Sequence, residues 1–240
     1  MERRRSVSKR HSTRRWHSTS DMMPIPCPCV RGAVLWPRPT HGQDVRGLLC
    51  RYAGTMQQFR YRLATVDDVA VITDIYNEAV MAGGSTADTV PVTYEARRRW
   101  IESHVDPYAV FVFETIAGDG EAEEVGFGAI SVFYDRPGYD GVCDLAYYVT
   151  ARWQRRGVGR FALRTLLNEC RARAMRKACA IIFSDNTASN ALVESFGFEP
   201  FGEMPEAAYD SRGVLHDMSY WCLDLTPLDA KGAVEGIARR

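Results

Sequence analysis

The apolar positions between residues 59 and 225 follow two periods, and each period predicts one kind of element. Runs of alternating, β-branched and aromatic residues predict strands, whereas apolar residues three and four positions apart predict helices. A first helix is expected behind TVDD at residues 65–68, a capping box, and should end near Gly83 and Gly84. Its apolar stripe consists of Val69, Ile72, Tyr76, Ala79 and Val80.

The expected order of elements is β-α-α-β-β-β-α-β-α-β-β. The strands should span residues 59–64, 109–114, 125–133, 142–149, 178–184, 198–203 and 215–225, and the helices about 69–83, 93–107, 157–175 and 187–196. An order in which a helix pair is followed by strands mixed with helices calls for the α/β (α+β) class, with a mixed sheet flanked by helices.

Residues 1–58 show neither period and are predicted to be a disordered extension. They include the proline-rich stretch PIPCPC, and residues 1–55 carry eleven basic and three acidic side chains, a net +8 that the remaining chain balances with −8. Such a tail is typical of segments that bind nucleic acid or acidic membranes, or of an organelle transit peptide. The simpler hypothesis gives it no folded role, with Met56 as an alternative start. Residues 227–240 are expected to form a flexible tail, which leaves 59–226 as one domain.

Composition narrows the class of protein. With 46% hydrophobic and 25% charged residues, the chain is typical of a globular protein. No apolar run reaches the roughly 20 residues that span a bilayer, so we expect a cytoplasmic protein without a membrane partner. The 7 cysteines include no CxxC pair, and the histidines show no metal-binding spacing, so neither a disulfide framework nor a metal site is expected.

The stretch QRRGVG at residues 154–159 lies between a predicted strand and a predicted helix and carries candidate chemistry. Backbone N–H groups at a helix start attract anions, glycines admit a phosphate close to the backbone, and arginines add charge. A P-loop would need Gly-Lys-Ser/Thr, which is absent. GVGRFA at residues 157–162 fits the dinucleotide pattern G-x-G-x-x-G/A. That pattern, however, requires its glycines directly at the strand end and an acidic residue about 20 residues further on. Neither requirement is met here.

The same stretch resembles the Q/R-x-x-G-x-G/A motif of the GNAT acetyltransferase superfamily, which cradles the pyrophosphate of acetyl-CoA. A second stretch, NTASNALVESFGF at residues 186–198, is similar to the superfamily's N-x-x-S-x-x-L and G-F motif. IYNEAV, RPGY and DLAYYV, which begin at Ile75, Arg136 and Asp144, resemble the branch that contains phosphinothricin acetyltransferases. The resemblance covers residues 60–225 and implies a GNAT-type sheet, mixed and mostly antiparallel.

The resemblance also implies a site for acetyl-CoA, the cosubstrate, and no metal. Two strands, residues 142–149 and 178–183, should splay apart and admit the pantetheine arm between them. The residues implied for binding acetyl-CoA are Tyr147, Tyr148, Val149, Gln154, Arg155, Arg156, Gly157, Val158, Gly159, Arg160, Asn186 and Ser189.

Acetyl transfer to an amine requires a base, because the ammonium ion must lose a proton before it attacks. Asp144 stands where the phosphinothricin branch has a glutamate interpreted as the base; orientation of the substrate ammonium is the alternative role. Val193 stands where many relatives have a Tyr or His that protonates the departing thiolate, and valine cannot do so. Tyr209 is the candidate replacement, although a thiolate can also leave without an acid.

The implied function is N-acetylation of a small amino acid or analogue, such as phosphinothricin or methionine sulfone, by direct transfer in a ternary complex. Arg136 is a candidate partner for a substrate carboxylate or phosphinate, and Tyr76 and Tyr139 are candidate pocket residues; a surface arginine with packing aromatics is the alternative. Two other functions stay open: a protein or peptide N-acetyltransferase, and a catalytically weak CoA-binding sensor. The resemblance implies a homodimer, and no nucleic-acid partner is expected for the folded domain.

Overall fold

A computed structural model of the chain describes residues 46–52, 55–116 and 122–225. The chain divides into two compact units, residues 1–31 and 32–240, and every described residue belongs to the second. Residues 1–45 of the predicted extension and the predicted tail at 227–240 therefore lie outside the described residues.

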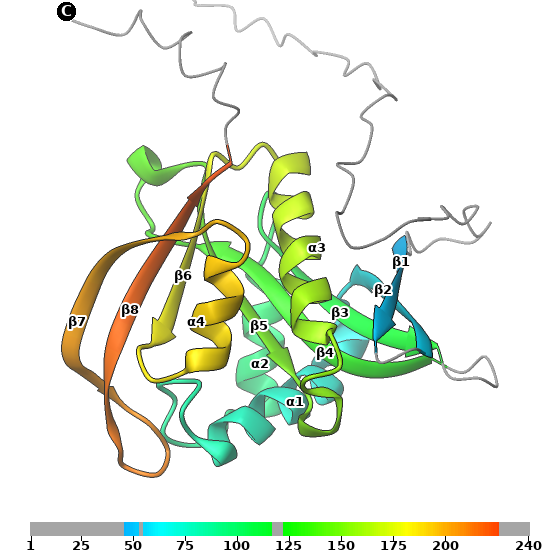
Figure 1. Cartoon of the computed structure of the whole chain (residues 1–240), viewed down its shortest axis with the longest axis horizontal. Coiled ribbons are helices and arrows are strands. Elements are labelled where there is room, and N and C mark those ends of the chain that lie inside the picture. Colours follow the sequence, from blue (N-terminus) through cyan, green and yellow to red (C-terminus); the bar gives the residue numbers. More distant parts are fainter. Residues whose placement is uncertain (1–45, 53–54, 117–121, 226–240) are drawn as a thin grey trace, which may run out of the picture. The chain divides into compact units, whose positions relative to one another are not determined.

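The described residues form one eight-stranded sheet in the order β1-β2-β3-β4-β5-β6-β8-β7 (Figure 1). Only β5 and β6 are parallel, and all other neighbouring strands in the described sheet are antiparallel. This mixed, mostly antiparallel sheet confirms the predicted fold class. The strands are β1 Arg46–Tyr52, β2 Thr55–Leu63, β3 Ala109–Ile116, β4 Ala122–Val132, β5 Val142–Val149, β6 Lys177–Phe183, β7 Glu199–Tyr209 and β8 Leu215–Asp224.

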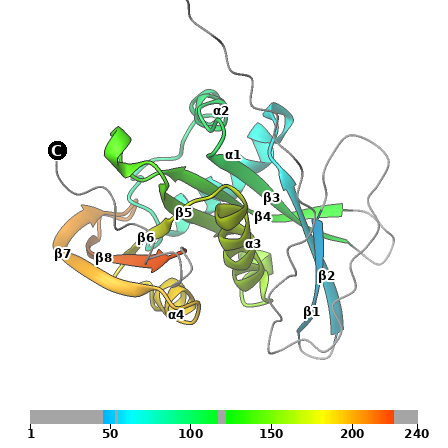
Figure 2. The same ribbon diagram turned by 90° about the horizontal axis from the view of Figure 1, so that it is seen from above.

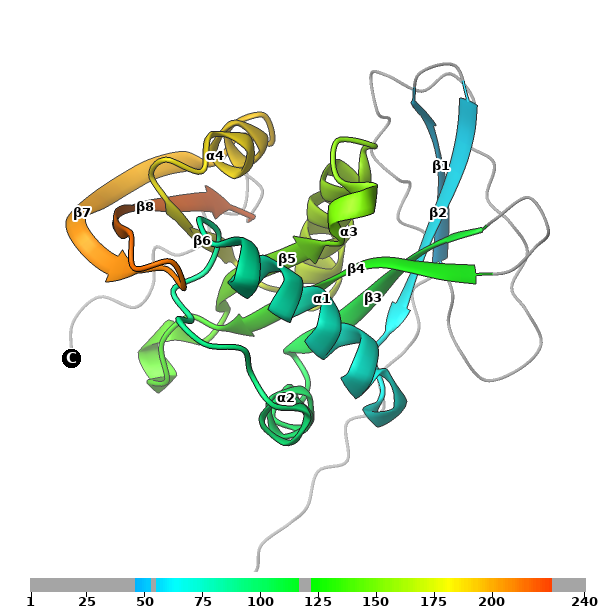
Figure 3. The same cartoon turned by 90° about the horizontal axis from the view of Figure 1, so that it is seen from below.

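Four helices cover the two faces of the sheet within the described part of the chain. Helices α1 (Val69–Ala82) and α2 (Tyr94–Glu102) lie on one face, and α3 (Val158–Ala172) and α4 (Thr187–Glu194) lie on the other (Figures 2 and 3). Because side chains alternate between the faces of a strand, β5 sends Asp144, Ala146 and Tyr148 toward α1 and α2. None of these helices is long and apolar enough to cross a membrane.

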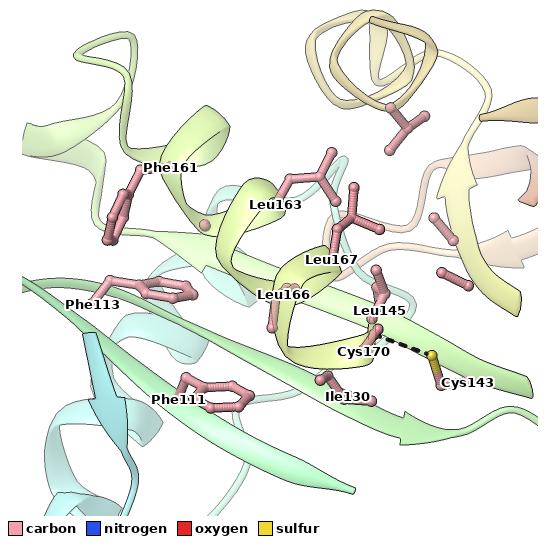
Figure 4. Packing of buried hydrophobic residues seen from close by; sticks show 14 of the residues in the cluster. Phe111, Phe113, Ile130, Cys143, Leu145, Phe161, Leu163, Leu166, Leu167 and Cys170 are labelled. Atoms are coloured by element: carbon pink, nitrogen blue, oxygen red, sulfur yellow. Dashed lines mark hydrogen bonds between the residues drawn. The ribbon is translucent and has the colours of Figure 1, made fainter. Parts of the chain in front are cut away.

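Each face of the sheet has its own hydrophobic core. The larger core lies under α3, where Phe161, Leu163 and Leu166 pack on Phe111 and Phe113 of β3 (Figure 4). The smaller core lies under α1 and α2 and includes Ile72, Val80, Ile101, Val112 and Phe127. The predicted apolar stripe of the first helix is therefore its packing face, and the apolar positions of residues 161–167 are core packing.

Local sequence signals explain where the helices start. The predicted capping box is present: the Thr65 side chain accepts the Asp67 N–H, and the Asp68 carboxylate accepts the Thr65 N–H at 2.7 Å. A short 3₁₀ turn, Val66–Asp68, follows it and leads into α1. The Thr93 side chain likewise accepts the Ala96 N–H at the start of α2. Both caps satisfy donors that a helix start leaves without partners.

Several boundaries differ from the sequence prediction; α2, for example, ends at Glu102 and not near residue 107. Residues 46–52 and 55–58, assigned to the disordered extension, belong to β1 and β2, which pair antiparallel. β7 continues to Tyr209 instead of ending near residue 203, because it pairs with β8 through two register shifts. α4 ends at Glu194, two residues early, because the Ser195 hydroxyl donates to the Leu192 carbonyl and Gly197 adopts a left-handed φ of 85°.

Candidate functional site

Strands β5 and β6 part after three residue pairs, and the opening forms the centre of the candidate site (Figure 1). Parallel pairing joins Val142 to Lys177, Cys143 to Ala178 and Asp144 to Cys179, and then it stops. Residues 145–149 still pair with β4, and residues 180–183 still pair with β8. The edges that face each other therefore carry backbone groups without a strand partner, which an extended ligand can satisfy. The predicted splay of these strands is confirmed.

The basic turn closes one end of this opening. After β5, a 3₁₀ turn at Ala151–Trp153 leads through Arg155, whose φ is 59°, to Gly157, whose φ is 90°, at the N-cap of α3. The first helical hydrogen bond of α3 runs from the Phe161 N–H to the Gly157 carbonyl, so the preceding N–H groups have no helical acceptor. Left-handed residues followed by a helix N-terminus form a concave set of donors that suits a phosphate.

The arginines of the turn differ in the partners that their side chains already have. Arg152 pairs with Glu123 at 2.9 Å, and Arg156 lies over the Trp153 ring at 5.1 Å. Arg160 reaches across to α4, where it donates to the Ser195 hydroxyl at 3.2 Å and lies 5.3 Å from the Phe196 ring. Arg152 is therefore the least available of these cations, whereas no carboxylate of the described residues is seen to pair with Arg156 or Arg160.

Helix α4 holds the other side of the opening. The Asn186 side chain caps α4 by accepting the Ser189 N–H at 3.1 Å. Sequence reasoning missed Asn190, whose amide donates to the carbonyls of Phe183, Ser184 and Asn186 and accepts the Trp221 indole N–H at 2.8 Å. Asn190 thus ties α4 to the end of β6 and to β8. Its only sequence signal is a second asparagine one helical turn after the cap.

The two tyrosines of β5 face opposite cores. Tyr147 lies on the α3 side, where burial raises the pKa of its phenol and the neighbouring Ser189 hydroxyl lowers it. Tyr148 lies on the α1 side, stacked on Phe127 at 5.3 Å, and burial raises its pKa well above the usual range. The Tyr148 side chain is therefore a packing group, and only its backbone faces the opening between the strands. Gln154 donates to the Val149 carbonyl at 3.4 Å, so it braces the end of β5.

Asp144 lies at the point where β5 and β6 part, directly opposite Cys179. Its Oδ1 atom is buried, and no described residue donates a hydrogen bond to it. Burial disfavours the charged form and raises the pKa of Asp144 to about 6, although a backbone hydrogen bond at Leu145 opposes part of that shift. A carboxylate with this pKa remains ionised at pH 7 and is a stronger base than an exposed aspartate.

The predicted acceptor-side residues lie at two separate places in the structure. Tyr76 is buried in α1, where its hydroxyl donates to Asp88 at 2.7 Å and bonds Thr86 at 2.8 Å, so it holds the α1–α2 connection. Arg136 and Tyr139 lie in the connection from β4 to β5 and are exposed. Arg136 lies 5.3 Å over the Tyr134 ring, and no carboxylate among the described residues pairs with it. Arg136 is thus free to pair with an incoming anion, whereas the Tyr76 hydroxyl is already engaged.

The two residues considered for thiolate protonation have different surroundings. Val193 is fully buried in the larger core, so the position supplies packing and no proton. Tyr209 lies at the end of β7 next to the hairpin tip, and its side chain is 56% exposed.

Sequence reasoning also missed a hydrogen-bond network that joins the β7–β8 hairpin to the connection between α1 and α2. The Asp210 carboxylate accepts hydrogen bonds from the N–H groups of Gly84, Arg212 and Val214 at 2.9 to 3.0 Å. Burial alone would raise the pKa of Asp210, but these bonds and the Arg212 side chain hold it below its usual range. His216 bridges this carboxylate to Asp185. In the sequence, Asp-Ser-Arg-Gly at residues 210–213 predicts a turn. It does not predict that the Asp210 carboxylate accepts a hydrogen bond from the distant Gly84 N–H.

The arrangement suits transfer between an extended thioester and an amine. The splayed strands offer backbone groups to the arm, the turn offers N–H groups and arginines to phosphates, and Asp144 offers a base. Within the described ranges, no group of three or more His, Cys, Asp or Glu side chains is placed to hold a metal ion.

Comparison with known proteins identifies the class. Residues 58–199 match the family described as the acetyltransferase (GNAT) domain. Since the match covers more than half of the chain, this protein belongs to the GNAT acetyltransferase family, and the resemblance predicted from the two motifs is confirmed.

Named relatives of this chain act on small amino-acid analogues. The L-methionine sulfoximine/L-methionine sulfone acetyltransferase of Pseudomonas aeruginosa is 30% identical over 169 residues, 69% of this chain and 94% of that protein. The phosphinothricin N-acetyltransferase of Streptomyces coelicolor is 31% identical over 152 residues, 62% of this chain and 86% of that protein. The structure of a phosphinothricin acetyltransferase from Sinorhizobium meliloti in complex with acetyl-CoA matches with a TM-score of 0.61 and 26% identity, and covers 68% of this chain and 86% of that one.

Proposed function

We propose that this protein transfers the acetyl group of acetyl-CoA directly to the primary amine of a small amino acid or analogue, of the kind represented by phosphinothricin and methionine sulfone. One observation carries the proposal: a buried carboxylate with a raised pKa, Asp144, lies where β5 and β6 part. Its relatives' named substrates support the substrate class.

The residues present fit acetyl-CoA. The unpaired edges of residues 145–149 and 180–183 would hold the pantetheine arm as an added strand, and the N–H groups of residues 155–160 would hold the phosphates. Gly157 and Gly159 keep that turn free of side chains, and Arg155, Arg156 and Arg160 supply positive charge. Acetyl-CoA supplies the activated acetyl group as its thioester.

Asp144 would remove a proton from the acceptor ammonium, since its carboxylate lies at the apex of the opening. The thiol of Cys179 lies opposite it, but burial raises the pKa of that thiol and keeps it protonated. Arg136 would pair with the carboxylate or phosphinate of the acceptor, with Tyr139 beside it. We assign no acid to the departing thiolate, because Val193 cannot serve and a water molecule suffices for a thiolate. Tyr209 stays a candidate only for that step.

We also propose a cytoplasmic homodimer. Four cysteines, Cys143, Cys170, Cys179 and Cys222, are free in the described part of the chain, and free thiols are typical of reducing compartments. The edge strand β7 exposes Phe201 and Met204, and an exposed apolar edge favours a partner of the same kind. Sedimentation of the purified chain measures this assembly directly.

The substrate class is tested by thiol release from acetyl-CoA with the full chain and a panel of amines. We expect release with at least one amino acid analogue, such as phosphinothricin or methionine sulfone, and none with basic peptides. The Asp144→Asn variant, which keeps the shape of the side chain, should bind acetyl-CoA and release no thiol. Turnover with peptides alone would mean that the acceptor is a peptide amine and not a small amino acid. Tight acetyl-CoA binding without turnover would favour a CoA-binding sensor.

A further inference from the structure

The tip of the β7–β8 hairpin is bonded to the connection between α1 and α2 (Figures 1 and 3). Asp210 Oδ2 accepts the Gly84 N–H at 3.0 Å, and the Ser211 hydroxyl donates to the Val80 carbonyl at the end of α1. These pairs lie 126 and 131 positions apart in the chain. Gly83, whose φ is 69°, lies so close that a Cβ on it would be 2.5 Å from Asp210 Oδ2. The two segments therefore fit each other closely.

The two carboxylate oxygens of Asp210 have different partners. Oδ1 accepts the N–H groups of Arg212 and Val214, both in the hairpin tip, at 2.9 Å. Oδ2 accepts the Gly84 N–H and the Arg212 side chain at 3.0 and 3.1 Å. Burial acts to raise the pKa of Asp210, but the hydrogen bonds from Val214 and Arg212 hold it below its usual range, so the carboxylate is charged at neutral pH. Oδ1 thus shapes the hairpin, and Oδ2 joins the hairpin to the α1–α2 connection by a charge-assisted bond.

The α1–α2 connection is held against β5, at one margin of the opening. The Tyr76 hydroxyl bonds the Thr86 hydroxyl at 2.8 Å and donates to Asp88 at 2.7 Å. The Tyr76 ring meets the Tyr148 ring edge-on, with 4.8 Å between the ring centroids. Tyr148 belongs to the stretch of β5 that β6 leaves unpaired. Through Tyr76, the connection is therefore fixed beside that margin.

The hairpin is held by β6, the other margin of the opening. Strand β8 pairs with β6 as far as Phe183, and the Ser184 N–H donates to the Asp217 carbonyl at 2.9 Å. The His216 ring stacks on Phe183 at 4.3 Å, and its Nδ1 donates to the Asp185 carboxylate at 2.9 Å, since a carboxylate accepts. The hydrogen bond from Gly84 to Asp210 thus joins a segment fixed to β5 to a segment fixed to β6.

This bond, named here the Asp210–Gly84 bridge, lies on the side from which an amine would approach Asp144. Helices α3 and α4 cover the opposite face of the sheet, whereas Asp144 points toward α1 and α2 (Figures 2 and 3). We propose that the bridge restricts the acceptor to small amines and so determines specificity. A small amino acid fits between the two margins with the bridge closed, whereas an amine that continues into a peptide requires it to open.

This inference rests on the proposed acetyl transfer at Asp144. Asp210 touches neither the acceptor nor the thioester and acts through Gly84 and the α1–α2 connection, so it is a positioning residue. Its effect should therefore fall on the acceptor and not on acetyl-CoA, whose proposed contacts lie on the turn before α3 and on the facing edges of β5 and β6.

The test is the Asp210→Asn variant in the full chain. Asparagine keeps one oxygen for the N–H groups of Arg212 and Val214 but turns an NH2 group toward the Gly84 N–H, so the bridge is lost and the hairpin turn is kept. We expect the KM of the best small acceptor to rise by about tenfold, and the affinity for acetyl-CoA, measured by calorimetry, to stay within about twofold.

The decisive readout is a ratio of two acceptors. A dipeptide that begins with the best amino acid acceptor is compared with that free amino acid, and the ratio of their kcat/KM values should rise by about tenfold in Asp210→Asn. A general loss of stability would lower both values together and leave the ratio unchanged. Ser211→Ala, which removes the bond to the Val80 carbonyl, should raise the ratio in the same direction and still decides if Asp210→Asn does not fold.

Asp217→Asn is the matched control, because it makes the same change on the same hairpin. The Asp217 carboxylate accepts the Glu206 N–H at 2.7 Å, a bond within the hairpin, so the acceptor ratio should stay at the wild-type value. A wild-type ratio in both Asp210→Asn and Ser211→Ala would overturn the bridge and leave the proposed function in place.

A wild-type chain that acetylates no small amine would instead overturn the proposed function. The bridge itself is checked without turnover by hydrogen exchange, because the Gly84 amide hydrogen should exchange faster in Asp210→Asn than in the wild type. Equal exchange rates in the two proteins would show that this bond does not hold the connection.

Discussion

At the residue scale, Asp144 shows how position alone can convert an ordinary carboxyl group into a candidate base. The same side chain at a strand end in water would have a pKa near 4. On β5 it lies between Ser131 of β4 and Cys179 of β6, and burial raises its pKa to about 6. The gain in basicity therefore has a cost in folding stability at neutral pH, because the folded protein must hold a poorly solvated charge.

We expect Asp144→Asn to raise the free energy of unfolding at pH 7, by up to about 3 kcal/mol, while it abolishes turnover. The folded pKa of about 6 exceeds the unfolded value near 3.8, so Asp144 stabilises the fold below pH 3.8 and that contribution is lost as the pH rises to 6. Urea unfolding of both proteins at several pH values measures the difference, which should be small at pH 4 and largest above pH 6. A constant difference would mean that Asp144 does not titrate as described.

At the element scale, the opening depends on α3 and α4 being held at fixed places on the sheet. The turn before α3 adopts left-handed backbone at Arg155 and Gly157, and α4 holds the end of β6 through Asn190. A Cβ atom on Gly159 would lie 3.3 Å from the Leu192 side chain and 3.8 Å from the Tyr147 ring. The glycine thus keeps α3 and α4 close together and leaves its own N–H accessible.

Replacing Gly159 with leucine should weaken acetyl-CoA binding at least tenfold, which corresponds to about 1.4 kcal/mol. The added side chain fills the space between α3 and α4 and covers the N–H groups of the turn. Gly157→Leu should have a similar effect because its φ of 90° strains any side chain. Calorimetry with acetyl-CoA gives the affinities. Gly202→Ala on the edge strand β7, where a Cβ meets nothing within 4 Å, is the control and should bind normally; equal affinities for all variants would exclude the phosphate cradle.

At the scale of the whole molecule, the candidate site draws on the centre of the sheet and not on its edges. The opening belongs to β5 and β6, whereas β1 pairs only with β2 at one edge and β7 pairs only with β8 at the other. The two cores lie on opposite faces of the same strands, so the central strands are fixed from both sides. Removal of an edge strand should therefore affect stability more than ligand binding.

A chain that begins at Met56 should keep its acetyl-CoA affinity within about twofold and unfold a few degrees lower than the full chain. It loses the β1 partner of β2 but none of the groups at the opening. For a protein of this size, each kcal/mol of lost stability lowers the melting temperature by about 2–4 °C. A chain that begins at Arg46 retains β1 and should melt like the full chain. Loss of acetyl-CoA binding from the Met56 chain would show that residues 1–55 contribute to the site.

The sequence by itself determined the order and type of the elements from strand β2 to strand β8, and the family. Hydrophobic period and capping are local signals, so residues 65–68 and the stripe of α1 could be interpreted without their partners. Phosphate binding by the QRRGVG turn could be predicted in the same way, because glycines and arginines before a helix favour an anion whatever the rest of the fold.

Only the tertiary structure decided which side chains meet. The pairing of Ser131 with Asp144 depends on the register of β4 and β5, and the contact from His104 to Ser131 joins residues 27 positions apart. The Asp210 carboxylate reaches the Gly84 N–H across 126 positions. Contacts of this kind come from strand order and from the packing of helices on the sheet, which no local period records. The raised pKa of Asp144 belongs with them, since burial is a property of the assembled sheet.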